Sequence, residues 1–272
     1  MAATLKDNFL AVIPARAGSK AIKNKNTRPL ANKPLFMWSV EQALASEYIS
    51  KVVVSTDDDK AIDIIKNYKK NRYPGHPADW KLDYVKRPAE ISGDNSPSEA
   101  ALIHAVEQQA RKPDYVVMLQ PTSPLRLNFL IDRCIEFMIE KKADCLLTGL
   151  KLYDFFWFEG NDPFLEETTG KDTTWNWFSS YHPRERKMRQ AFGRADFRYF
   201  DTGSVYITRT DILMQYKCRI LNTKYLTPEG EVEGKVCVYP TSQLESIQID
   251  SEEDFEMCER ILKGTVLDAI ND

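Results

Sequence analysis

The fold prediction starts from one stretch near the N-terminus, Phe9-Leu-Ala-Val-Ile-Pro-Ala-Arg-Ala-Gly-Ser-Lys20. It begins with a continuous apolar run, which is typical of a buried strand in a parallel sheet. The turn that follows contains Gly18, and glycine lets the backbone approach a ligand closely. Backbone N–H groups in such a turn can bind an anion. Positively charged side chains surround the turn, at Arg16, Lys20, Lys23 and Lys25.

The residues alone leave two interpretations of this basic turn: a phosphate-binding loop or a solvated basic loop. The sequence has no G-x-x-x-x-G-K-[ST] pattern, so the turn is not a Walker loop. It also has no G-x-G-x-x-G pattern after the first strand, which argues against a dinucleotide-binding fold. If the turn binds phosphate, it therefore belongs to another class of nucleotide site.

Apolar runs alternate with helical patterns through the first half of the chain. We expect strands at residues 9–13, 51–55, 115–119 and 145–147. Apolar residues with helical spacing lie between and after them, at residues 36–43, 61–68, 101–106 and 130–138. This alternation predicts an α/β fold, with a mostly parallel sheet covered by helices on both faces. In such sheets, ligands bind in the loops at the carboxyl ends of the strands.

The second half of the chain departs from this alternation. Aromatic side chains crowd residues 152–180, and we expect residues 152–200 to form an elaborated lid or insertion. For these rings, packing within a lid or dimer is favoured over stacking on a sugar. Residues 208–238 are a candidate dimerisation arm within a single domain of residues 1–272. The remaining expected elements are strands at 204–207 and 235–239, an exposed turn at 230–234 and a helix from Ser251.

Composition and charge narrow the class of protein. The formal net charge is -3, without the basic excess of a non-specific nucleic-acid binder, so we expect no nucleic-acid partner. The five cysteines are scattered and form no C-x-x-C pair, which argues against a disulfide framework or a zinc site. No apolar run is long enough to span a membrane. We therefore expect a cytoplasmic protein without membrane insertion.

Three further polar segments carry candidate binding groups. Gln120-Pro-Thr-Ser-Pro-Leu-Arg126 directly follows a predicted strand. Arg87-Pro-Ala-Glu-Ile-Ser-Gly-Asp-Asn-Ser-Pro-Ser98 enters a predicted helix, whose N-terminus can hold a phosphate. Ser246-Ile-Gln-Ile-Asp250 alternates like a strand and ends in a carboxylate that can bind Mg²⁺. Taken alone, each segment is better explained as an ordinary turn or helix cap.

Taken together, these segments resemble the acylneuraminate cytidylyltransferase family, the CMP-sialic acid synthetases, to which the CMP-Kdo synthetases are related. Six blocks occur in the family's order and span nearly the whole chain. They are Pro14-Ala-Arg-Ala-Gly-Ser-Lys20 with Lys25-Asn26, Val54-Ser-Thr-Asp57, Arg87-Pro-Ala-Glu90, Leu119-Gln-Pro-Thr-Ser-Pro-Leu-Arg126, Thr202-Gly-Ser-Val-Tyr206, and Ile249-Asp250.

This resemblance implies a fold and a reaction. The fold is a Rossmann-like, mostly parallel sheet of the nucleotide-diphospho-sugar transferase type, with an extended lid or dimerisation arm, usually in a homodimer. The reaction transfers CMP from CTP to the anomeric hydroxyl of a 2-keto-3-deoxy sugar acid, such as a sialic acid-like nonulosonate. A CMP-sugar and pyrophosphate are the products, and Mg²⁺ is the implied cofactor.

The resemblance also implies roles for individual residues. Arg16 and Lys25 match the family's phosphate-binding positions and are the expected catalytic pair. The expected nucleotide-binding residues are Ala15, Arg16, Gly18, Ser19, Lys20, Lys25, Asn26, Arg87 and Ser98. The expected sugar-binding residues are Gln120, Arg189, Gln190, Thr202 and Gly203. The expected metal-binding residues are Asp250 and Gln248.

Gln248 marks a departure from the family's pattern, which usually has Asp-Ile-Asp where this chain has Gln248-Ile-Asp250. Because alternate residues of a strand face the same side, both positions would meet one metal ion. An amide attracts Mg²⁺ less than a carboxylate does. Three outcomes are open: weaker metal binding, a substitute acid such as Asp201, or loss of activity.

Two alternatives to the leading function stay open at this point. The chain can be a nucleotidyltransferase of the same fold that uses another nucleotide, or another acceptor such as a Kdo-like acid or a phosphonate. It can also be a nucleotide-binding protein with weakened catalysis, an alternative suggested by Gln248 at a position where the family usually has Asp. The sequence does not identify the acceptor.

Overall fold

The computed structural model describes residues 7–18, 22–72, 81–127, 129–152, 157–159, 177–179, 188, 193, 197–221, 225–227, 230–232 and 234–269. The chain divides into two compact units. The first consists of residues 1–150 and 201–272, and the second of residues 151–200. The second unit covers nearly the same residues as the expected lid or insertion, whose role stays a prediction. Within it, β8 (Trp157–Glu159) pairs antiparallel with β9 (Trp177–Ser179).

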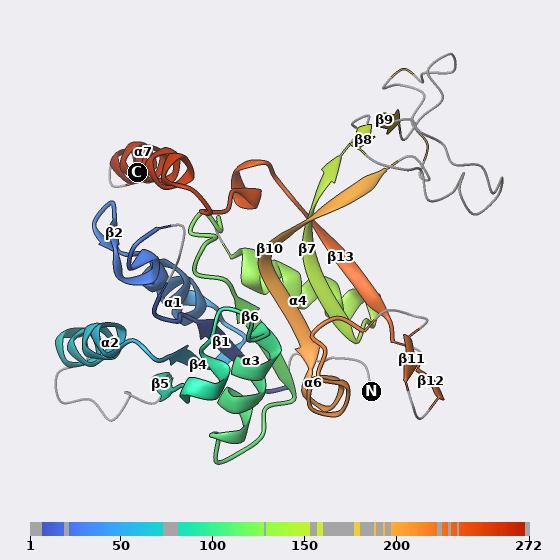
Figure 1. The fold of residues 1–272 in the computed structure, drawn as a ribbon, viewed down its shortest axis with the longest axis horizontal. Helices are drawn as coiled ribbons and strands as arrows, with labels where there is room; N and C mark the ends of the chain where they lie inside the picture. Colours follow the sequence, from blue (N-terminus) through green and yellow to red (C-terminus); the bar gives the residue numbers. More distant parts are fainter. Residues whose placement is uncertain are drawn as a thin grey trace. The chain divides into compact units, whose positions relative to one another are not determined.

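A seven-stranded sheet forms the centre of the first unit, in the order β13-β7-β10-β6-β1-β4-β5 (Figure 1). β1 pairs in parallel with both β4 and β6, and β4 pairs in parallel with β5. β10 runs antiparallel to β6, so the sheet is mostly parallel, as predicted. Its strands are β1 (Phe9–Pro14), β4 (Ile49–Thr56), β5 (Leu82–Lys86), β6 (Tyr115–Leu119), β7 (Cys145–Leu152), β10 (Arg198–Arg209) and β13 (Val236–Thr241).

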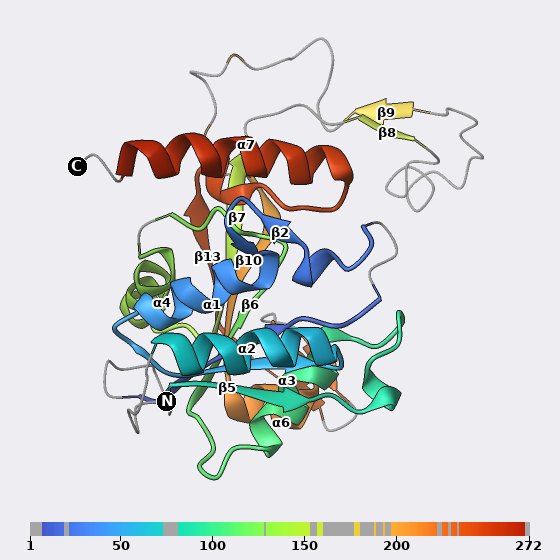
Figure 2. The same cartoon turned by 90° about the vertical axis from the view of Figure 1, so that its left-hand side faces the viewer.

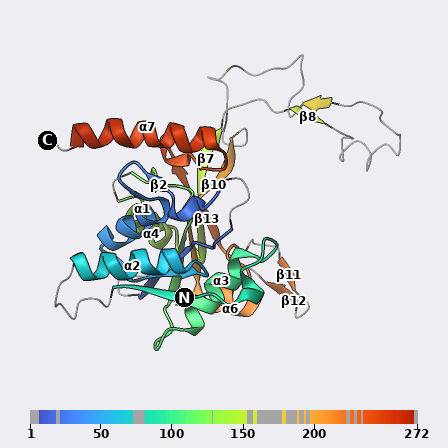
Figure 3. The ribbon, with the colours of Figure 1, turned by 60° about the vertical axis from the view of Figure 1, so that its left-hand side comes forward.

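Helices cover both faces of this sheet (Figure 3). One face buries apolar side chains of α1 (Leu35–Ala45), α2 (Asp59–Arg72) and α4 (Leu130–Lys141). The other face packs against α3 (Ser98–Glu107) and α6 (Thr210–Tyr216). The central strands therefore lack solvent-facing sides, and for this reason their sequences are continuous apolar runs rather than alternating patterns.

The C-terminal helix α7 (Glu252–Ala269) forms a third, smaller core beside the loop that follows β1. In Figure 2 it lies across the top, next to β2 (Pro29–Leu30), which pairs with β3 (Lys33–Pro34). Phe255 and Leu262 of α7 pack with Leu30 and with Ile249, which precedes the helix. This packing brings the segment before α7 against the loop after β1, although more than 200 residues separate them in the chain.

Two local expectations are wrong. Residues 230–234 are not an exposed turn, because Gly230–Val232 form β12, which pairs with β11 (Tyr225–Thr227). Gly234 is buried, and a Cβ there would lie 2.7 Å from the carbonyl oxygen of Leu221. Residues 247–250 are irregular rather than a strand, because the N–H of Ile249 donates to the carbonyl oxygen of Thr122 instead of joining a ladder.

The sequence pattern also missed several elements. β5 and α6 are short, and the hairpin of β11 and β12 lies in a polar segment. Short 3-10 helices occur at Lys25–Thr27, Ala89–Ile91 and Leu244–Ser246. Among the described residues, no helix combines the length and the apolar character that crossing a membrane requires.

Candidate functional site

An open cleft lies where the parallel strands β1 and β6 end. The loops after β1, β5 and β6 meet at this edge because these strands point the same way, as the sequence predicted from strand direction. The N-terminus of α3 and the segment before α7 complete the lining. The predicted site residues that line the cleft are Arg16, Lys25, Asn26, Arg87, Ser98, Gln120 and Asp250.

The loop after β1 is fixed by backbone hydrogen bonds to the neighbouring strand. The N–H of Ala15 donates to the carbonyl oxygen of Ser55 over 2.9 Å, and the N–H of Ala17 donates to Oδ1 of Asp57 over 2.7 Å. Gly18 has a φ of +72°, which glycine adopts most readily, and apart from its neighbours in the chain no described residue places an atom within 4 Å of a Cβ built there. Space beside this backbone is consistent with a ligand's close approach. Ser19 and Lys20 lie outside the described residues.

Arg16 faces the cleft with its charge paired to an acid. Its Nη1 lies 2.5 Å from Oδ1 of Asp94, and both side chains are about one-third exposed. The side chain of Asn26 donates to the carbonyl oxygen of Arg16 over 2.9 Å, which fixes the backbone below the guanidinium. A triphosphate that binds Arg16 would therefore compete with Asp94 for this side chain.

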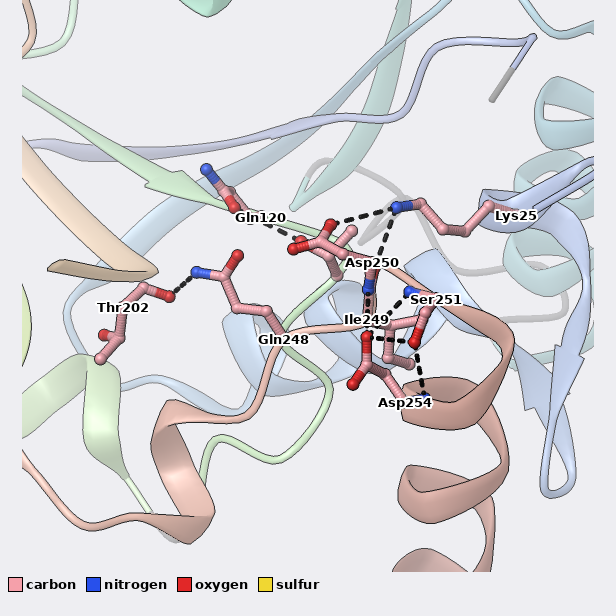
Figure 4. A network of polar contacts seen from close by, with 9 residues as sticks. Lys25, Gln120, Thr202, Gln248, Ile249, Asp250, Ser251 and Asp254 are labelled. Atoms are coloured by element: carbon pink, nitrogen blue, oxygen red, sulfur yellow. Dashed lines mark hydrogen bonds and ion pairs between the residues drawn. The ribbon is translucent and has the colours of Figure 1, made fainter. Parts of the chain in front are cut away.

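The ammonium group of Lys25 reaches the segment before α7. Its Nζ donates to the carbonyl oxygen of Ile249 over 2.9 Å and lies 3.6 Å from Oδ1 of Asp250 (Figure 4). The Lys25 side chain is 13% exposed, whereas that of Asp250 is 74% exposed. Lys25 thus connects the loop after β1 to Asp250, the expected metal ligand.

Arg87, an expected nucleotide-binding residue, lines the cleft and is only 7% exposed. Its Nη2 donates to the carbonyl oxygen of Ser55 over 2.8 Å, and its Nε donates to Oγ of the same serine. Burial lowers the pKa of the Arg87 guanidinium, and nearby Asp57 opposes that shift. Since its donors are engaged with Ser55 at the end of β4, Arg87 also holds β4 to the loop after β5.

The expected sugar side is built around Gly203, which has a φ of +62°. A Cβ at this position would lie 2.8 Å from Oε1 of Gln120 and closer still to Nε2 of Gln248. Gln120 accepts a hydrogen bond from Thr122 over 3.3 Å, and Gln248 donates its amide to the carbonyl oxygen of Thr202 (Figure 4). Two amide side chains therefore converge beside Gly203, whose left-handed backbone favours glycine.

Thr202 and Asp201 are held by groups of the sheet. The Thr202 hydroxyl is buried and bonds to Thr148 of β7. The Asp201 carboxylate accepts hydrogen bonds from the N–H of Gly203 and from the hydroxyl of Tyr206. Burial, together with Asp201, raises the pKa of Tyr206 to about 12, so this hydroxyl stays protonated as a donor. Arg189 and Gln190 lie outside the described residues.

The structure adds residues that the sequence patterns did not assign. They are Asp94, which pairs with Arg16, Asp57, which accepts from the N–H of Ala17, and Ser55, which accepts from Arg87. Asp57 lies in one of the six blocks of the family's pattern, and Asp94 lies in the polar segment 87–98. Their roles as partners of backbone and guanidinium groups depend on distances between strands, which spacing in the sequence does not give.

Asp250 is the described carboxylate that fits a magnesium ion in this cleft. It lines the cleft and is mostly exposed. Mg²⁺ is commonly held by one or two carboxylates together with substrate phosphates, so one carboxylate is sufficient. Gln248 directs its amide nitrogen to Thr202 and is not part of the cleft lining; its role as a metal ligand stays a hypothesis. No cluster of three or more acidic, histidine or cysteine side chains suited to a metal occurs among the described residues.

An α/β fold with a cationic cleft at the carboxyl ends of its parallel strands is typical of nucleotide-binding enzymes. The family model described as cytidylyltransferase matches residues 10–218, more than half of the chain. The chain belongs to the cytidylyltransferase family.

Relatives with established names share part of the sequence. The chain is 34% identical to the N-acylneuraminate cytidylyltransferase of Escherichia coli O18:K1:H7 over 53% of its length and 32% of that protein. It is 27% identical to the pseudaminic acid cytidylyltransferase of Campylobacter jejuni over 73% of its length and 80% of that protein. It is 37% identical to the CMP-N,N'-diacetyllegionaminic acid synthase of Legionella pneumophila over 47% of its length and 52% of that protein.

Solved structures share the fold. A CMP-2-keto-3-deoxy-manno-octonic acid synthetase in complex with CTP is 14% identical, with a TM-score of 0.56 over 95% of this chain and 99% of that one. The 4-diphosphocytidyl-2C-methyl-D-erythritol synthase of Anaerococcus prevotii is also 14% identical, with a TM-score of 0.61 over 94% of this chain and 96% of that one. At this identity the likeness concerns the fold alone.

Proposed function

We propose that this protein transfers CMP from CTP to the anomeric hydroxyl of an acidic, sialic acid-like nonulosonate. The observation that carries the proposal is the position of Arg16, Lys25 and Arg87 around one cleft at the strand ends. The names of the E. coli, Campylobacter and Legionella relatives support both the nucleotide and the class of acceptor.

In this reaction the anomeric oxygen attacks the α-phosphorus of CTP, the bond to pyrophosphate breaks, and the hydroxyl proton is lost. Nucleotidyl transfer asks little covalent chemistry of a protein, so positioning and charge stabilisation dominate. Arg16 and Lys25 neutralise the triphosphate. Arg87, Asn26 and Ser98 hold the nucleoside, and Gln120 with the Thr202–Gly203 backbone orients the sugar.

Asp250 would hold Mg²⁺ beside the triphosphate, where the metal supplies Lewis-acid stabilisation of phosphate charge. Lys25 restrains Asp250 from one side and leaves the carboxylate largely exposed to the cleft. The contribution of the chain is thus to keep a carboxylate and an ammonium group side by side at the phosphate end.

The test is pyrophosphate release from CTP, Mg²⁺ and a panel of acids. The panel contains N-acetylneuraminic, legionaminic, pseudaminic and Kdo-type acids, each also tested with GTP, UTP and ATP. We expect release with CTP and at least one nonulosonate. Release only with another nucleotide, or with none of the acids, would contradict the proposal.

A second candidate function is nucleotide binding with weakened catalysis, favoured by Gln248 at a position where an acid is expected. Under this alternative, the unaltered protein binds CTP but turns over slowly, and Gln248→Asp raises the rate. Fast turnover by the unaltered protein rejects the alternative. Because Gln248 donates to Thr202, we expect Gln248→Asp to lose that hydrogen bond and about 1 kcal/mol of stability.

Assembly is a separate proposal. We propose a homodimer in which residues 208–238 or residues 152–200 contribute the contact. Analytical ultracentrifugation of the full chain and of variants with either segment shortened distinguishes the two segments, and a monomer at micromolar concentration argues against the dimer.

A further inference from the structure

Arg126 is a buried charge that lies outside the lining of the cleft. It is only 5% exposed, and every described acceptor of its hydrogen bonds is a neutral group. Burial lowers the pKa of its guanidinium. An unpaired buried charge is costly unless its donors are satisfied, so this network must hold the side chain in one geometry.

The guanidinium joins two strands where their ladder ends. Val205 of β10 pairs with Leu119 of β6 in the last register position toward the cleft. One residue further on, Nη2 of Arg126 donates to the carbonyl oxygens of both Gln120 and Ser204, each over 2.6 Å, and Nε donates to Ser204 over 2.9 Å. The side chain thus replaces strand pairing at the point where the polypeptide enters the cleft.

The other side of the guanidinium is tied to α1 and to the loop after β6. Nη1 donates to the carbonyl oxygen of Ser123 over 2.6 Å and to Oγ of Ser39 over 2.9 Å. Ser39 in turn donates to the carbonyl oxygen of Gln120 over 3.2 Å. The position of Gln120 is therefore fixed by α1 as well as by its own loop.

One of the two bridged carbonyl groups belongs to Gln120, and the other belongs to Ser204, which follows Gly203. Gln120 and Gly203 are also the residues that meet on the expected sugar side. Oε1 of Gln120 lies only 2.8 Å from a Cβ built on Gly203, so the Gln120 side chain lies directly against the Gly203 backbone. A shift of the bridge would change the distance between Gln120 and the Thr202–Gly203 backbone.

We propose that Arg126 is a positioning residue of the acceptor site, which sets the spacing between Gln120 and Gly203 without touching substrate. The proposal rests on the proposed function for its catalytic consequence. A planar guanidinium is required because Nη2 must reach two carbonyl oxygens while Nη1 reaches α1. The compact ammonium of lysine cannot make these contacts at once.

The experiment compares Arg126→Lys with Arg209→Met in the full chain. Arg209 serves as the control because it also ties β10, through Asp144 and Asp211, at the opposite end of the strand. For Arg126→Lys we expect kcat/KM for the acid to fall about 10–100-fold, as misplacement of a substrate-orienting group does. CTP affinity by calorimetry should change less than about threefold. Arg209→Met should leave both quantities near those of the parent.

A second readout does not depend on turnover. In spectra of side-chain amides, the NH₂ signals of Gln120 and Gln248 should move in Arg126→Lys and stay in place in Arg209→Met. Ser39→Ala, which removes one anchor of the bridge in a helix that favours alanine, should shift the same signals less. This variant keeps the test available if Arg126→Lys fails to fold.

Unchanged Gln120 and Gln248 signals in a folded Arg126→Lys, or in Ser39→Ala if Arg126→Lys does not fold, would overturn the positioning role. Equal losses of CTP affinity and acceptor kcat/KM would also overturn it, because they indicate a general structural role. Failure of the unaltered protein to release pyrophosphate with any acid would instead refute the proposed function, while the amide signals would still decide the role of Arg126.

Discussion

Arg16 and Gly203 show how the candidate site depends on single residues. Arg16 is a partly exposed cation paired with Asp94, and a phosphate bound by Arg16 would have to displace this acid. Gly203 is a position where the absence of a side chain matters, because two amides fill the space. The first residue acts through charge and the second through shape, so their substitution should have different signatures.

Arg16→Ala should reduce kcat/KM for CTP about 100-fold or more, because it removes a charge that stabilises the triphosphate. Stability should change little, since exposed ion pairs contribute about 0–1 kcal/mol. Steady-state kinetics and thermal unfolding check the two parts. Lys86→Ala, which removes the exposed pair with Asp59 outside the cleft, is the control. Equal kcat/KM values for Arg16→Ala and the parent would remove Arg16 from the site.

Gly203→Ala should lower the free energy of unfolding by about 2 kcal/mol, because the left-handed backbone and the contact with Gln120 both oppose a Cβ. Gly264→Ala in α7 is the matched control, since no atom lies within 4 Å of a Cβ there. Alanine at that helical position should add about 0.5–1 kcal/mol. Urea denaturation measures both. A neutral Gly203→Ala would show that Gln120 and Gln248 can move apart at little cost.

At the element scale, the start of α7 connects the helix to the cleft. The Asp254 carboxylate accepts hydrogen bonds from the N–H groups of Asp250 and Ser251 and from the Ser251 hydroxyl. Burial opposes ionisation of Asp254, but these hydrogen bonds lower its pKa overall. One cap therefore begins the helix and also holds the backbone of the expected metal ligand.

Asp254→Ala should destabilise the protein by about 1 kcal/mol near neutral pH, as the loss of a helix cap does. Because the pKa of Asp254 is lowered in the folded state, its contribution is present above the ordinary value of 3.8 and is lost as the pH falls through the lowered pKa. The stability difference should thus shrink in acid, which urea denaturation at several pH values measures. Glu256→Ala on the exposed face of α7 should show no such trend.

At the scale of the whole molecule, the cleft joins parts of the first unit that are distant in the sequence. Lys25 contacts Ile249 and Asp250 across more than 220 residues, and Arg28 pairs with Glu252 over 2.6 Å. The loop after β1 and the segment before α7 thus close one site from opposite ends of the chain. A ligand held between them should stabilise the folded state as a whole.

Mg²⁺ and CTP at about 100 times the dissociation constant should add roughly 2.7 kcal/mol to the stability. This corresponds to a rise of roughly 5 °C in Tm for a chain of this size. Thermal unfolding with CTP, UTP, GTP and ATP measures the effect, and removal of Mg²⁺ by a chelator should reduce it. A Tm that none of the four nucleotides shifts would contradict nucleotide binding in this cleft.

Most strands of the sheet and one side of the cleft follow from the sequence pattern alone. Runs such as Phe9–Pro14 and Tyr115–Leu119 are apolar throughout because both faces of the sheet are covered, so composition alone identifies them. The position of Arg16 and Gln120 just after such strands follows from chain order, since parallel strands end at the same edge. Short-range physics was sufficient for these features.

Contacts between distant segments could not be predicted from local pattern, because they depend on how the whole chain packs. Gln248 and Asp250 alternate like residues of a strand, yet the backbone between them bonds to Thr122, and the two side chains point to different partners. The sequence places Arg126 in a turn, whereas the structure shows that it bridges the ends of β6 and β10. Local pattern specifies which residues are buried or extended, whereas hydrogen bonds across hundreds of residues depend on the packing of the whole sheet and its helices.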